Sequence, residues 1–127
     1  MMMSAHDLVV RARDSVTEFD VGDAPRVLQA ADVIIDVREA DEYQSGHLPR
    51  AINIPRGVLE FKLSSADTLS SRDLQIVLYC KSSGRATLAA QSLQQMGYRN
   101  VHSLAGGFDA YCAAGMPVIK PIEPAFD

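Results

Sequence analysis

Two short, uninterrupted apolar runs constrain the fold more than any other feature of the sequence. Residues 33–35 read Val-Ile-Ile between Asp32 and Asp36, and residues 75–79 read Gln-Ile-Val-Leu-Tyr directly before Cys80. A strand that is apolar on both faces is typical of the interior of a parallel sheet with helices on each side. These runs are far too short to cross a bilayer, so we expect them in the core of a globular domain.

Helical patterns alternate with these strands along the chain. We expect further strands at residues 17–21, 51–54 and 100–103, and helices at 4–15, 22–29, 39–44, 57–63, 86–96 and 106–114. Ser4 is a candidate cap of the first helix, and the serine-rich residues 64–71 are expected to form a loop. The alternation indicates a three-layer α/β/α fold with a central, mainly parallel five-stranded sheet. The expected organisation is an N-terminal helix in residues 1–16, one domain in 17–120 and a C-terminal tail in 121–127.

Composition excludes several classes of function. The net charge of −4 argues against nucleic acid as a partner, and no stretch indicates a membrane segment. The two cysteines are too few for a disulfide framework and lack the spacing of a zinc site. The first residues do not resemble a secretory signal, so we expect a cytoplasmic protein. No metal or other cofactor is expected.

Cys80 has the sequence context of a reactive cysteine. It ends an expected strand, and the loop before the next helix consists of Lys81, Ser82, Ser83, Gly84 and Arg85. Ligands of parallel sheets bind beyond the carboxyl ends of the strands, where Cys80 would lie. The helix N-terminus and the two cations favour the thiolate, and the glycine lets backbone N–H groups converge on the sulfur. A buried structural cysteine is the alternative, although such a polar loop makes a poor apolar pocket.

The charge around Cys80 is also uneven. The segment between Asp73 and Asp109 contains no Asp or Glu, but it contains Lys81, Arg85 and Arg99. A locally cationic stretch in an acidic protein could attract a small anion. Chance clustering of charges is the simpler interpretation of this feature alone.

Three blocks of sequence, in order, resemble the rhodanese family over about residues 17–117. The first comprises residues 34–38, Glu42-Tyr43, 46–49 and 51–55; the second is Tyr79-Cys80 with its loop and Arg85-Ala86; the third comprises Gly97-Tyr98, Asn100-Val101 and 104–108. The resemblance implies a rhodanese-like fold and sulfur transfer. Cys80 would take a sulfur atom from a donor, hold it as a persulfide and pass it to a thiol, cyanide or protein-thiol acceptor.

The loop separates the alternatives within this superfamily. Four residues lie between Cys80 and Arg85, as in sulfur-handling members, whereas the related phosphatases have five. Lys81 would suit a small anionic donor such as thiosulfate. A persulfide relay module that serves a partner protein remains an alternative, and the sequence leaves open whether the protein is a monomer or a homodimer.

Asp36 and Arg38 are candidates for a supporting role. The resemblance implies that they lie close to the loop, where they could orient it or screen the donor. The plainer interpretation is structural, with Asp36 capping the next turn and Arg38 pairing with Glu42, four residues on.

Three other residues invite interpretation. His47 is expected to serve a turn and packing rather than act as a base. Arg50 stands where a small residue is common in the family; we expect it to point into water, with an anion contact as the lesser alternative. Cys112 is expected to be buried in the last helix. The N-terminal helix could pack on the sheet or mediate a dimer contact.

Overall fold

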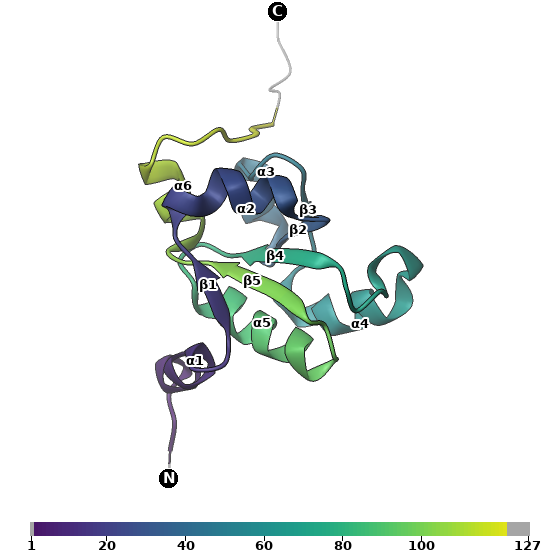
Figure 1. Ribbon diagram of the computed structural model, residues 1–127. Coiled ribbons are helices and arrows are strands. Elements are labelled where there is room, and N and C mark those ends of the chain that lie inside the picture. Colours follow the sequence, from purple (N-terminus) through teal and green to yellow (C-terminus); the bar gives the residue numbers. More distant parts are fainter. Residues whose placement is uncertain (1, 122–127) are drawn as a thin grey trace, which may run out of the picture.

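The computed structural model describes residues 2–121, and its centre is a sheet of five parallel strands (Figure 1). The strands are β1 (Thr17–Phe19), β2 (Val33–Asp36), β3 (Ala51–Asn53), β4 (Gln75–Tyr79) and β5 (Asn100–Leu104). Their order across the sheet is β1-β5-β4-β2-β3, and all four pairings are parallel. The three-layer α/β/α architecture with a five-stranded sheet is therefore confirmed.

Helices cover both faces of the sheet. In Figure 1, α2 (Ala24–Ala30), α3 (Ala40–Ser45) and α6 (Gly107–Ala113) lie above it, and α1 (Ala5–Arg13), α4 (Leu59–Ser65) and α5 (Gly84–Gln95) lie below it. Three 3-10 turns complete the described elements: η1 (Val21–Asp23), η2 (Arg56–Val58) and η3 (Asp67–Leu69). Between residues 2 and 121, no helix is both long and apolar enough to cross a membrane.

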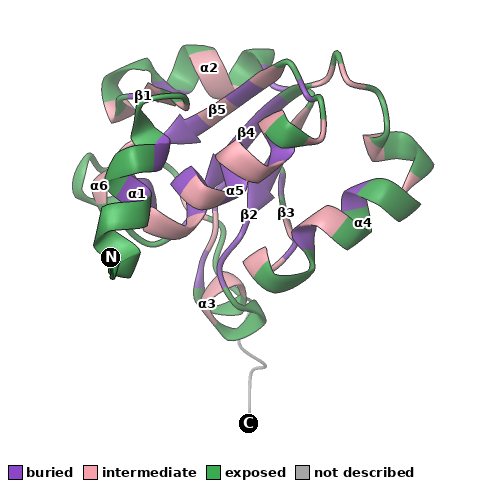
Figure 2. Cartoon of the chain, turned by 90° about the horizontal axis from the view of Figure 1, so that it is seen from below, coloured by how far each residue is buried: buried purple, intermediate pink, exposed green. Residues whose placement is uncertain are grey.

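The alternation of β4 side chains divides the core in two. Ile76, Leu78 and Cys80 belong to the cluster between the sheet and helices α4 and α5. Val77 and Tyr79 belong to the cluster between the sheet and helices α2 and α6. Figure 2 shows the buried residues concentrated on the strands and on the inner sides of the helices. Burial on both faces explains why this strand reads as a continuous apolar run.

The N-terminal helix α1 packs on the domain. Ser4 caps it as expected, because its hydroxyl accepts from Asp7 N at 3.1 Å and Asp7 binds back to Ser4 N at 2.9 Å. Val9 and Ala12 are buried, and α1 contacts α5. The helix thus packs chiefly on α5, one layer away from the sheet on which packing was expected.

Three expectations about local structure were wrong. The strand expected at 17–21 ends at Phe19, and η1 begins at Val21. Residues 64–71 are not a plain loop, because α4 continues to Ser65 and η3 follows it. Helix α5 begins at Gly84, two residues earlier than expected, since the chain turns into the helix within the loop after Cys80. The expected tail 121–127 lies outside the described residues apart from Pro121.

The Arg50 side chain binds the backbone at the end of α2 and does not simply point into water. Its guanidinium donates to the carbonyl oxygens of Leu28 at 2.9 Å and Ala31 at 2.8 Å, at the end of α2. Ala31 follows the last residue of α2, and the Leu28 carbonyl oxygen also accepts from Ala31 N at 3.3 Å, so the arginine adds two hydrogen bonds to the carboxyl end of α2. Arg50 has φ 68°, a left-handed conformation that favours glycine.

Candidate active site around Cys80

The sulfur of Cys80 lies at the carboxyl end of β4, beside the N-terminus of α5. The residue is 1% exposed, and its Sγ accepts a hydrogen bond from Ala86 N at 3.4 Å. Ala86 is the third residue of α5, so its N–H has no partner within the helix. The partial positive charge of the helix end and this N–H both favour negative charge on the sulfur.

The start of α6 fixes the loop from outside. Phe108 N donates to the carbonyl oxygen of Cys80 at 2.8 Å, and Asp109 N donates to that of Lys81 at 3.0 Å. Gly107 permits this approach: a Cβ there would lie 2.5 Å from the carbonyl oxygen of Cys80 and 2.8 Å from that of Lys81. Sequence reasoning did not assign Gly107 to the site, although the Gly106-Gly107 pair was the available signal.

Each cation of the expected cationic stretch is paired with a carboxylate. Lys81 Nζ lies 2.9 Å from Asp109 Oδ2, and Arg99 Nη2 lies 2.6 Å from Asp73 Oδ1. Arg85 donates two parallel hydrogen bonds to Glu42, from Nη1 to Oε1 at 2.8 Å and from Nη2 to Oε2 at 3.0 Å. The stretch therefore does not present three unpaired charges to an anion.

The Arg85–Glu42 pair is less exposed to solvent than the Lys81–Asp109 pair. Hydrogen bonds from Arg85 lower the pKa of Glu42 to about 2, against the opposing effect of burial. The same bonds raise the pKa of Arg85, and the negative charge of Glu42 adds to that increase. Glu42 is thus a site residue that sequence reasoning assigned to the wrong partner.

Asp36 and Arg38 form a buried ion pair, so the expected Arg38–Glu42 pair was wrong. Arg38 Nη2 lies 2.7 Å from Asp36 Oδ2 and donates to the carbonyl oxygen of Gly46 at 2.6 Å. Asp36 also accepts from Arg38 N at 2.9 Å, whereas the residue that caps α3 is Glu39. Burial disfavours the charge on Arg38, but the contacts with Asp36 raise its pKa overall.

The ion pair reaches the loop through an aromatic ring. The guanidinium of Arg38 lies 4.3 Å from the centre of the Phe108 ring, a cation–π distance. Phe108 in turn holds the Cys80 carbonyl through its backbone N–H. Arg38 therefore contacts a residue that anchors the loop, and Asp36 is linked to that residue only through Arg38.

The two loop serines have different environments. Ser82 is exposed, as is Lys81, whereas Ser83 is 9% exposed. The Ser83 hydroxyl oxygen accepts from Arg13 Nη2 at 2.8 Å. A contact between the N-terminal helix and this loop was not foreseen from the sequence.

His47 and Cys112 lie apart from this arrangement. The His47 ring stacks on Tyr43 with centres 3.8 Å apart, and its backbone exchanges two hydrogen bonds with Ile119, which fits the expected packing role. Cys112 is exposed, so the expectation of burial was wrong. Helix α6 buries Gly107 and Tyr111, and its turn carries the next residue away from the core.

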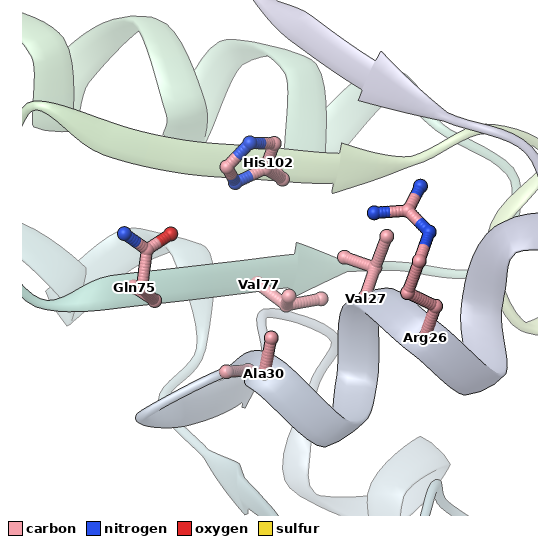
Figure 3. Close-up of a pocket in the computed structure, with 7 residues that line it drawn as sticks. Arg26, Val27, Ala30, Gln75, Val77 and His102 are labelled. Carbon is pink, nitrogen blue, oxygen red and sulfur yellow. The ribbon is translucent and has the colours of Figure 1, made fainter.

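A separate hollow of about 150 Å³ lies between α2 and strands β4 and β5 (Figure 3). The side chains of Val27, Val77 and His102 line it, together with Arg26. The side chain of Val77 faces α2, whereas the side chain of Cys80 lies between the sheet and α5. The hollow therefore lies on the opposite face of the sheet from Cys80.

The sequence profile described as the Rhodanese-like domain matches residues 21–114. The chain belongs to the rhodanese-like domain family. It is 31% identical to a sulfurtransferase from Allochromatium vinosum, over 76% of this chain and 87% of that protein. It is 29% identical to thiosulfate sulfurtransferase 18 from Arabidopsis thaliana, over 83% of this chain and 85% of that one.

Other relatives of the chain differ in length and in description. Three of them are longer, and the chain spans 56% to 60% of their length. A solved structure from Rhodopseudomonas palustris, described as a protein of unknown function and possible tyrosine phosphatase, superposes with a TM-score of 0.83. That structure is 29% identical, and the match covers 94% of this chain and 96% of that one.

Proposed function

We propose that the protein is a sulfurtransferase in which Cys80 carries the transferred sulfur as a persulfide. The observation that carries the proposal is the buried Cys80 sulfur, which accepts a hydrogen bond from the first turn of α5. Such a site stabilises a thiolate or a persulfide anion without a metal or a separate base. The names of the two sulfurtransferase relatives support the same reaction class.

With thiosulfate as donor, the reaction has two displacement steps. The Cys80 thiolate attacks the outer sulfur of thiosulfate, a bond forms between the two sulfur atoms, and sulfite leaves with the electron pair of the broken bond. An acceptor such as cyanide or a thiolate then attacks the outer sulfur of the persulfide. The product leaves with that sulfur, and the Cys80 thiolate is regenerated with its electron pair.

The loop residues have supporting roles in this proposal. Lys81 and Ser82 are exposed and can meet an anionic donor, although Lys81 must share its charge with Asp109. Arg85 is turned toward Glu42, so it stabilises the loop more than it contacts the donor. Asp36 and Arg38 act at a distance, through Phe108.

The test is formation of thiocyanate from thiosulfate and cyanide by the purified protein. We expect turnover by the wild type, loss of turnover in Cys80→Ala, and retention in Cys112→Ser. Cys112 is the matched control because it is the other free cysteine and is exposed. Turnover that survives Cys80→Ala would contradict the proposal.

Two alternatives predict other outcomes of the same experiments. A relay module would load sulfur on Cys80 but transfer it slowly to small acceptors and rapidly to a partner protein. A phosphatase, suggested by the description of the R. palustris structure, would hydrolyse an aryl phosphate in a reaction dependent on Cys80. The four residues between Cys80 and Arg85 favour sulfur transfer over that reaction.

A further inference from the structure

Ser4 and Ser83 each stand directly before a helix, but their hydroxyl groups bind different partners. Ser4 precedes α1, and its oxygen accepts from the third residue of the helix, Asp7, at 3.1 Å. Ser83 precedes α5 in the same way, but its side chain makes no capping hydrogen bond. Serine in this position ordinarily accepts from the second or third N–H of the helix, so Ser83 departs from the usual behaviour.

The N–H that Ser83 would ordinarily cap is the one that binds the Cys80 sulfur. Ala86 is the third residue of α5, and its N–H points to Cys80 Sγ at 3.4 Å. One N–H cannot serve both acceptors well. The Ser83 oxygen instead accepts from Arg13 Nη2 at 2.8 Å, and the Ser83 backbone has φ −161° and ψ −18° rather than the extended conformation of Ser4.

Arg13 reaches this serine from a firmly placed helix. Arg13 is the last residue of α1, a helix that precedes the matched family region and buries Val9 and Ala12. Val9 lies against the start of α5, because a Cβ on Gly84 would come within 3.5 Å of Val9 Cγ2. Arg13 Nε also lies 3.6 Å from Glu18 Oε1, and the Arg13 side chain is 41% exposed.

We propose that Arg13 is a positioning residue that keeps the Ser83 hydroxyl from capping α5 and so reserves the Ala86 N–H for the Cys80 sulfur. An arginine can only donate hydrogen bonds, so it engages an oxygen lone pair of Ser83. This hydrogen bond directs the Ser83 hydroxyl oxygen toward Arg13. Without the arginine, the hydroxyl could turn toward the Ala86 N–H, just as the Ser4 hydroxyl oxygen accepts from Asp7 N at α1. This role rests on the proposed sulfur transfer through Cys80.

The test compares Arg13→Met with Arg11→Met. Arg11 lies in the same last turn of α1 and its guanidinium contacts Met3, so it matches the charge and the helix without touching the loop. We expect Arg13→Met to lower kcat for sulfur transfer from thiosulfate about three- to tenfold, the effect of one hydrogen bond, with little change in KM. Arg13→Lys should restore part of the loss, and Arg11→Met should behave as wild type.

The Ser83→Ala background supplies the decisive comparison. If the serine is the competitor, Arg13→Met should have no further effect once Ser83 is alanine. The Ala86 amide resonance in NMR spectra should move in Arg13→Met, and should not move when the same change is made in Ser83→Ala. An undiminished Arg13→Met defect in the Ser83→Ala background, or equal behaviour of Arg13→Met and Arg11→Met, would overturn the inference. The NMR comparison needs no sulfur transfer, so it judges Arg13 even if the thiosulfate reaction is absent.

Discussion

Replacing Gly107 with alanine would place a methyl group where the backbone of the Cys80 loop already lies. The new Cβ would stand 2.5 Å from the carbonyl oxygen of Cys80 and 2.8 Å from that of Lys81. Both neighbours are backbone atoms, so either the loop or the start of α6 must move. Gly107 also has φ 58°, a conformation that costs a residue with a Cβ about 1 to 2 kcal/mol.

The displacement would weaken two hydrogen bonds as well. Phe108 N lies 2.8 Å from the Cys80 carbonyl oxygen, and Asp109 N lies 3.0 Å from that of Lys81. Such a bond contributes about 0.5 to 1.5 kcal/mol to the free energy of unfolding. With the backbone cost, Gly107→Ala should lower that free energy by about 2 to 5 kcal/mol, a large part of the roughly 5 to 15 kcal/mol typical of a domain.

Urea unfolding of Gly107→Ala and Gly115→Ala measures the steric part separately. Gly115 has φ 72°, but nothing lies within 4 Å of a Cβ there, so alanine at that position carries only the backbone cost. We expect Gly107→Ala to lose about 1 to 3 kcal/mol more than Gly115→Ala, the share of the two hydrogen bonds. Equal losses in the two variants would refute the reasoning about the loop.

Three further perturbations test other contacts. Arg50→Ala and Arg50→Gly both lose the hydrogen bonds from Arg50 to the end of α2. Alanine keeps the cost of a left-handed backbone conformation, whereas glycine removes that cost. Urea unfolding should therefore find the glycine variant about 1 kcal/mol more stable than the alanine variant. Because the pKa of Glu42 is lowered to about 2, stabilisation by Arg85 is complete above the usual value of 4.5 and is lost as pH falls through about 2. The stability gap between wild type and Glu42→Gln should therefore shrink from pH 5 to pH 2; a constant gap would contradict this. Arg38→Met should cost about 3 to 5 kcal/mol in thermal or urea unfolding, because it leaves the Asp36 charge buried without a partner.

The sheet was predictable because its strands are marked by local composition. The boundaries of β4, residues 75–79, were correct to the residue, since the apolar run ends where the strand meets the polar loop. The start of α5 was not, because Gly84 and Arg85 look like loop residues and the turn into the helix is imposed by Cys80 and α6. The end of the edge strand β1 was also missed, because the chain turns into η1 soon after Phe19, so local patterns fixed the buried central strand better than the edges of the fold.

The candidate site was predictable at Cys80 and its loop but not in its pairings. The partners of Arg85 and Ser83 are 43 and 70 residues away in the sequence, and no local spacing indicates which carboxylate or arginine will arrive. The four-residue spacing of Arg38 and Glu42 suggested a helical pair, yet Arg38 precedes α3 and turns back to Asp36. Cys112 was misjudged because apolar neighbours in the sequence do not show which side of a short helix is buried. In α6 the buried side carries Gly107 and Tyr111, and Cys112 lies on the exposed side.

The mass of the protein after incubation with thiosulfate tests the central claim most directly. Intact-protein mass spectrometry should show the gain of one sulfur atom on the wild type and on Cys112→Ser, and peptide mapping should locate it on Cys80. Cyanide should then remove it. No gain on the wild type, or an equal gain on Cys80→Ala, would contradict the assignment of Cys80 as the sulfur-carrying nucleophile.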